Sequence, residues 1–257
     1  MDLRQKLEKR VADGRHGRAR SLVNYPHYEV CEAHKLRLRG LTPEMRIPRE
    51  KWFDHPFYRK QKQMCDYHVH FREEMLQVMV GIQGAHNLFL DAGGREEDEA
   101  NRERARAGMM KSLRRTSSIF SKSMEVLNFH VTMEERYLFP EMQKISIIDL
   151  SFLYQDHKHL HEAEAKVTSA LDVLLQHLLR TMTARSQEYL KQQRSQGQSD
   201  SKDDKGDRGD SDEDVKGGQM FLDLIACALE FDTVFMNHLG EEEEIVMPIS
   251  LTNIIHL

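Results

Sequence analysis

Apolar residues recur at spacings of three and four from about residue 64 onward, which predicts amphipathic helices. The first helix carries the stripe His68, Phe71, Met75, Val78, Ile82 and Phe89. The second carries Leu113, Phe120, Met124, Leu127 and His130, and is expected to stop at Pro140. The third begins near Ser151 and shows Leu160, Val167, Leu171, Leu174 and Leu178; the fourth shows Phe221, Leu224, Cys227, Phe231, Phe235 and His238. Four such stripes are buried most simply in an all-α, up-and-down four-helix bundle, which we predict over residues 63–250.

Three segments fall outside this pattern. Residues 1–62 show no sustained periodicity and contain several prolines, so we expect an irregular N-terminal extension that packs on the bundle. Residues 191–218 contain a single aliphatic residue, Val215, and are predicted to form a disordered acidic linker between the third and fourth helices. Residues 251–257 are expected to form a C-terminal tail.

Composition narrows the possible partners. The formal net charge of −5 gives no reason to expect nucleic acid or an anionic membrane as a partner. No stretch approaches the roughly 20 apolar residues that span a bilayer. The three cysteines are odd in number and far apart in sequence, as in an intracellular protein with reduced thiols. We therefore expect a cytoplasmic protein.

The chain contains an internal repeat. The second helix ends with His130-Val-Thr-Met-Glu-Glu-Arg-Tyr-Leu-Phe-Pro140, and the fourth with His238-Leu-Gly-Glu-Glu-Glu-Glu-Ile-Val-Met-Pro248. Both segments follow the pattern H-x3-E-E-x4-P without a gap. The first and third helices each begin with H-x-H, at His68 and at His157. The sequence therefore predicts a helical hairpin that is used twice.

This spacing directs polar side chains into the predicted core. Residues four apart lie on the same face of a helix, so His130 and Glu134 point the same way, along the apolar stripe. His238 and Glu242 do the same on the fourth helix. A carboxylate in a bundle core costs several kcal/mol unless it is paired or bound to a cation. In an antiparallel bundle, His68 and His157 are expected at the same depth, which would complete a set of metal ligands.

The residue types indicate which metals suit this set. Imidazole and carboxylate together suit iron or zinc better than calcium or magnesium. With His161 one turn beyond His157, the set contains five histidines and at least two glutamates. That number is too large for one ion and about right for two ions bridged by carboxylates.

These motifs resemble those of the hemerythrin-like (HHE cation-binding) family over roughly residues 64–250. The resemblance implies a centre of two iron ions, bridged by an oxo or hydroxo group and by carboxylate. It also implies the metal ligands His68, His130, Glu134, His157, His161, His238 and Glu242. Members of the HHE type place the last carboxylate four residues after the histidine, at Glu242, whereas other hemerythrins place it five residues after, at Glu243. We favour Glu242 because it matches Glu134.

Three functions are compatible with this reading. The leading hypothesis is a non-enzymatic di-iron protein that binds dioxygen or a related diatomic ligand, or that senses iron or oxygen. The second is an oxidase or peroxidase that uses the same centre, although the sequence shows no nucleophile and no glycine-rich phosphate loop. The third is an interaction protein with a structural or regulatory metal, whose N-terminal extension binds a protein partner.

Overall fold

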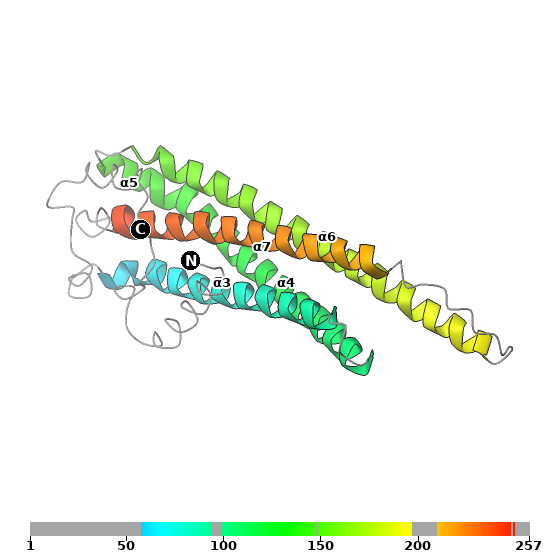
Figure 1. The fold of residues 1–257 in the computed structure, drawn as a ribbon. Helices are drawn as coiled ribbons and strands as arrows, with labels where there is room; N and C mark the ends of the chain where they lie inside the picture. The colour runs from blue at the N-terminus through cyan, green and yellow to red at the C-terminus, as the bar shows by residue number, and fades with distance from the viewer. Residues whose placement is uncertain (1–57, 94–98, 147–148, 197–209, 248, 250–257) are drawn as a thin grey trace. The chain divides into compact units, whose positions relative to one another are not determined.

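The computed structural model describes residues 58–93, 99–146, 149–196, 210–247 and 249. These residues are helical almost throughout and include no strand, which confirms the predicted all-α class. The four long helices are α3 (Tyr58–Ala92), α4 (Glu99–Met133), α6 (Ser151–Gln196) and α7 (Asp210–Glu241) (Figure 1). Two π-helical segments, η4 (Glu134–Leu138) and η5 (Glu242–Val246), follow α4 and α7, and the short helix α5 (Phe139–Ile145) follows η4.

The chain divides into two compact units, and each long helix contributes one segment to each unit. Of the described residues, 58–80, 119–146, 149–164, 229–247 and 249 belong to unit 1, and 81–93, 99–118, 165–196 and 210–228 belong to unit 2. Within unit 1, α3 and α6 contribute their N-terminal segments, whereas α4 and α7 contribute their C-terminal segments. This alternation is the one that an up-and-down bundle requires.

Contacts in unit 1 show that its facing helices are antiparallel. On α3, His68 meets Glu242 and the later residue Phe71 meets the earlier residue Phe235. On α6, Tyr154 meets Phe139, and the later residue His157 meets Glu134. The core between them contains an aromatic chain in which the rings of Phe71, Phe235, Phe231 and Phe120 contact one another in turn.

Unit 2 contains a close approach between α3 and α4 that only glycine permits. A Cβ atom added at Gly81 would lie 2.1 Å from Oγ1 of Thr116 on α4, a residue that is 2% exposed. The Ser112 hydroxyl, one turn before Thr116, donates a hydrogen bond of 3.2 Å to the carbonyl of Gly81. The glycine therefore lets the two helices touch through backbone and hydroxyl groups.

Three of the long helices extend beyond the ranges predicted from the sequence. Helix α3 begins at Tyr58, inside the predicted extension. Helices α6 and α7 reach Gln196 and Asp210, so both ends of the predicted linker 191–218 are helical. A polar sequence without apolar residues can still extend a helix that is already nucleated, because each added residue gains a backbone hydrogen bond. Residues 1–57, 197–209 and 251–257 lie outside the described residues, and with them most of the extension, the middle of the linker and the tail.

Pro140 does not end the second helix as predicted. The helical path continues through η4 into α5, where Pro140 occupies the first turn. Proline is tolerated there because the missing N–H would have no intrahelical partner.

None of the helices in the described part of the chain has a stretch long and apolar enough to cross a bilayer.

The two glycines of α3 provide a test of the helix packing in unit 2. Replacing Gly81 with Ala is expected to lower the free energy of unfolding by about 1–3 kcal/mol, because the new methyl group overlaps Thr116. Gly84→Ala is the matched control, since no atom lies within 4 Å of a Cβ at that position, and it should stabilise the protein by up to about 1 kcal/mol. Urea unfolding of both variants measures the difference. Equal stabilisation by both would contradict the close approach of α3 and α4.

Candidate metal centre

Four histidines and two glutamates, one histidine from each long helix, converge in the core of unit 1. All six side chains belong to residues that are at most 7% exposed. The histidines are His68 of α3, His130 of α4, His157 of α6 and His238 of α7, and the glutamates are Glu134 and Glu242, the first residues of η4 and η5. Six of the seven ligands predicted from the sequence are therefore brought together.

The two glutamates occupy equivalent positions at the start of a π turn. The backbone N–H of Phe139 bonds to the carbonyl of Glu134, and that of Met247 bonds to the carbonyl of Glu242, five residues back in each case. A proline follows each of these donors in the sequence. Because proline cannot donate a backbone hydrogen bond, the wider turn before it disturbs the helix little. Single π turns of this kind often occur at functional sites.

The ligand atoms form two groups that share both carboxylates. In the first group, Nε2 of His68 lies 3.0 Å from Oε2 of Glu242, and Nε2 of His130 lies 3.0 Å from Oε1 of Glu134. In the second, Nε2 of His157 lies 3.6 Å from Oε2 of Glu134, and Nε2 of His238 lies 3.3 Å from Oε1 of Glu242. Within each group all ligand atoms are within 4.8 Å of one another.

These atoms are buried but form no hydrogen bonds. The Nε2 atoms of the four histidines and both oxygens of Glu134 and of Glu242 have no hydrogen-bond partner. Burying a polar group without a partner costs on the order of 1–3 kcal/mol, and more for a charged group. Metal cations held between the nitrogens and oxygens would satisfy these atoms. The arrangement can therefore hold metal.

A second glutamate fixes each of two histidine rings from the other side. Nδ1 of His68 lies 3.1 Å from Oε1 of Glu243, and Nδ1 of His157 lies 2.9 Å from Oε1 of Glu135. A carboxylate can only accept, so Nδ1 carries a proton, and Nε2 is the nitrogen that could give its lone pair to a metal ion. Each pair of consecutive glutamates thus holds both nitrogens of one imidazole, as in the carboxylate–histidine–metal arrangements of many metalloproteins.

The wider π turn explains how two consecutive glutamates can contact the same imidazole ring. An i→i+5 turn contains more residues than an α-helical turn, so consecutive side chains diverge less around the axis. Glu134 and Glu135 can therefore reach the same ring. The alternative that placed a ligand at Glu243 is not what the structure shows, because Glu243 contacts Nδ1 of His68 and the buried residue Arg72.

The charges in the cluster shift several pKa values. Burial would lower the pKa of His68, but Glu242 and Glu243 raise it to about 9. Burial acts likewise on His157, whose pKa Glu134 and Glu242 raise to about 10. His238 shows the opposite balance: burial lowers its pKa to about 4. Protons on His68 and His157 therefore balance the carboxylates when no metal is bound, and a metal ion would displace them.

The carboxyl groups of Glu242 and Glu243 remain ionised in spite of burial. Burial would raise the pKa of Glu243, but Arg72 and His68 lower it to about 2. The pKa of Glu242 is also raised by burial but lowered well below its usual range by the surrounding histidines, His238 first. Glu242 thus offers negatively charged oxygen ligands at neutral pH.

His161 is the predicted ligand that the structure does not bring into the cluster. Its side chain is 47% exposed, and Nδ1 lies 3.3 Å from Oε2 of Glu164. The next buried residue of α6 after His157 is Leu160, three positions later, and not His161, four positions later. His161 is therefore turned to the flank of the helix.

Arg72 is the residue of the centre that the sequence patterns did not single out. It is 4% exposed and lies one turn after His68 on α3, so it shares the face of the ligand. A charged residue at that spacing on an otherwise apolar stripe was the available signal.

Aromatic rings pack against two histidines of the cluster. The ring of Phe71 lies 5.6 Å from that of His130, and Phe139 stacks on His157 at 5.4 Å. Phe71, Phe139, Leu160 and Leu239 are all fully buried. These buried side chains make the surroundings of the ligands largely apolar.

Comparison of the chain with protein-family models, with curated proteins and with solved structures finds no match.

Removing the outer carboxylate should weaken metal binding without removing a ligand. Glu135→Ala is expected to lower the affinity for Zn²⁺ by roughly 10- to 100-fold, because the His157 ring loses the group that orients it. Glu141→Ala is the control, since Glu141 pairs with Lys144 on the surface of α5. Titration in competition with a chelator measures both. An unchanged affinity in Glu135→Ala would show that the contact does not orient the ligand.

The two histidines of the H-x3-H motif are expected to behave differently. His161→Ala should leave the metal content per chain unchanged, whereas His157→Ala should reduce it, since only His157 faces the shared carboxylates. Elemental analysis of the purified variants measures this. Equal losses of metal in both would mean that His161 turns inward to bind.

Proposed function

We propose that the cluster holds two iron ions, bridged by Glu134 and Glu242, in a non-haem di-iron centre of the hemerythrin-like kind. The observation that carries this proposal is how the carboxylate oxygens are divided. Oε1 of Glu134 faces His130 and Oε2 faces His157; Oε2 of Glu242 faces His68 and Oε1 faces His238. Each carboxylate therefore offers one oxygen to each of two positions.

The number of ligand atoms also favours two ions. Four imidazole nitrogens and four carboxylate oxygens lie buried without hydrogen bonds. Divided equally, they give each ion two nitrogens and two oxygens. A single ion could not contact all eight, and the remainder would stay buried and unsatisfied.

The choice of iron rests on ligand chemistry and on the sequence resemblance. Mixed imidazole and carboxylate ligands suit iron and zinc, while calcium and magnesium favour oxygen alone. The doubled H-x3-E-E-x4-P motif of the hemerythrin-like family favours iron over zinc. Non-haem ferrous sites with histidine and carboxylate ligands commonly keep positions open for a further ligand.

The function that these features support best is binding of dioxygen or a related diatomic ligand, or sensing of oxygen or iron. Reduced iron, when bound, would supply the affinity for such a ligand. Phe71 and Phe139 shield the histidine rings that they contact from water, and Glu243 and Glu135 hold protons at Nδ1 of His68 and His157. An apolar enclosure of this kind favours a small uncharged ligand over an organic substrate.

Metal content and the response to air test this proposal. Protein purified without oxygen should contain about two irons per chain. A visible absorption band should then appear on admitting air and disappear on removing it. Two irons with steady consumption of peroxide or ferrous iron would favour an enzyme instead, and zinc or no metal would contradict the di-iron proposal.

Two variants separate a shared carboxylate from a ligand of one position. Glu242→Ala should lose both irons, because both groups depend on Glu242. His130→Ala should lose no more than one, since His130 belongs to the first group alone. Equal losses in the two variants would contradict the bridged arrangement.

A further inference from the structure

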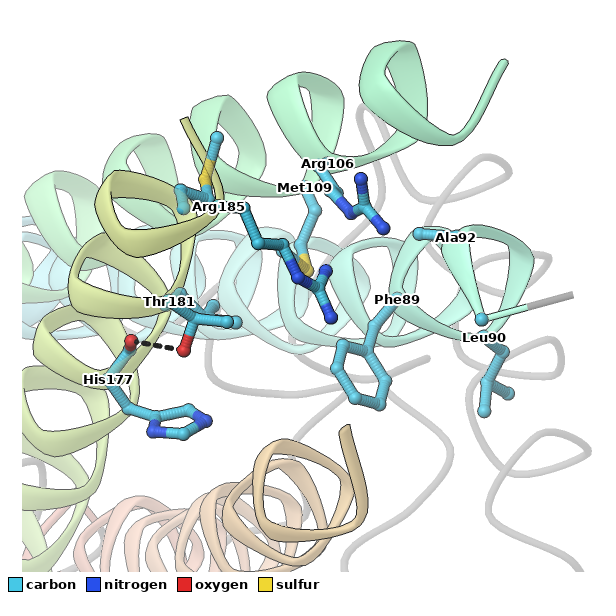
Figure 2. A pocket seen from close by; sticks show the side chains of 11 residues that line it. Phe89, Leu90, Ala92, Arg106, Met109, His177, Thr181 and Arg185 are labelled. Carbon is cyan, nitrogen blue, oxygen red and sulfur yellow. Dashed lines mark hydrogen bonds between the residues drawn. The ribbon is translucent and has the colours of Figure 1, made fainter. Parts of the chain in front are cut away.

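Unit 2 contains a cavity of its own, with a volume of about 250 Å³. Figure 2 shows side chains entering it from three helices: Phe89 from α3, Arg106 and Met109 from α4, and His177, Thr181 and Arg185 from α6. None of these residues belongs to the metal centre. Its ligand would therefore be a separate one.

Two guanidinium groups line the cavity. Arg106 and Arg185 both line it, and no aspartate or glutamate is among the described residues that do so. Arg106 pairs with Glu99, at 3.0 Å from Nη1 to Oε1, but the Glu99 side chain is 65% exposed. Water screens that pair, so the ion pair holds Arg106 in place without cancelling its field inside the cavity.

The remaining wall is apolar and is held in a fixed position. The Phe89 ring lies against the backbone of α7, where a Cβ atom added at Gly217 would be 3.1 Å from it. It also contacts the ring of Phe221, with centroids 5.1 Å apart. Ala92, Met109 and Leu178 complete this side, and all three are buried.

One polar group of the cavity is already occupied. The Thr181 hydroxyl donates a hydrogen bond of 3.0 Å to the carbonyl of His177 on the preceding turn, as Figure 2 shows. The charged donors that line the cavity are the guanidinium groups of Arg106 and Arg185.

From this combination we propose that the cavity binds a small carboxylate with an apolar body. The planar guanidinium group matches a carboxylate, to which it can donate two parallel hydrogen bonds. The apolar wall matches the hydrocarbon part of such a ligand. An inorganic anion has no apolar surface that could pack against this wall. The volume lies below the roughly 300–1,000 Å³ of pockets that hold drug-sized ligands, so the ligand is smaller than these.

Calorimetric titration of the full chain with three probes tests the proposal. Octanoate supplies the charge and the apolar chain, octanol the chain alone, and inorganic phosphate the charge alone. Octanoate should bind with one site per chain, at least about tenfold more tightly than either of the others. Only octanoate can contact both the arginines and the apolar wall. Equal binding of octanol or of phosphate, or no binding of octanoate, would overturn the proposal.

Variants locate the site. Arg106→Gln and Arg185→Gln should each weaken octanoate binding about tenfold or more. Arg180→Gln, on the exposed face of α6, should change it less than twofold. Ala92→Met, which fills the cavity and keeps both arginines, should also reduce binding. Circular dichroism confirms that each variant is folded, and equal losses in Arg180→Gln and Arg185→Gln would place the binding elsewhere.

The test is independent of the iron proposal. His130→Ala, which changes the metal centre in unit 1, should bind octanoate as the unaltered chain does. A loss of octanoate binding in this variant would contradict a separate site in unit 2.

Discussion

The structure of unit 1 depends on burying polar atoms that its own side chains do not satisfy. Glu134 and Glu242 lie in a core made mainly of phenylalanine, leucine and methionine, and neither carboxylate has a hydrogen-bond partner. Water would satisfy them if the helices separated, so the cluster opposes the apolar contacts around it. Protons on His68 and His157 reduce this conflict, and a metal ion would remove it. The same residues that would bind metal are therefore the ones that weaken the bundle without it.

The internal repeat distributes the centre evenly between two hairpins. Each hairpin supplies one carboxylate that points between the helices and one that grips the Nδ1 atom of an imidazole, through consecutive glutamates in a π turn. The two halves are not electrostatically equal. Glu243 is buried and pairs with Arg72, whereas the Glu135 side chain is 39% exposed. The positive charge of Arg72 makes Glu243 a weaker hydrogen-bond acceptor for Nδ1 of His68. Nε2 of His68 should therefore donate its electron pair to a metal ion less strongly than Nε2 of His157 does.

The sequence could predict the parts of the fold that periodicity determines. The stripes on the four helices, the depth of the histidines and the doubled motif led to six of the cluster's residues, because all of them follow from residues repeating on one helical face. His161 was misplaced because spacing alone cannot decide whether a stripe continues at three residues or at four, and here Leu160 takes the core position. The π turns could not be foreseen, since a proline reads as a helix end. Arg106 and Arg185 lie far apart in sequence, and only the packing of α4 against α6 brings them to one cavity.

Shared carboxylates have a consequence for how the proposed iron centre fills. The first ion would bear the cost of ordering Glu134 and Glu242 and of releasing protons from the histidines near them. The second ion would then meet carboxylates already turned toward it, each with one oxygen still unbound. A first ligand that orders what a second one uses makes the second bind more tightly, even without any change in the helices. The first ion would also repel the second, but Glu134 and Glu242, shared by both positions, would offset part of that repulsion. On this balance, the arrangement of Glu134 and Glu242 favours filling both positions together over leaving one of them half complete.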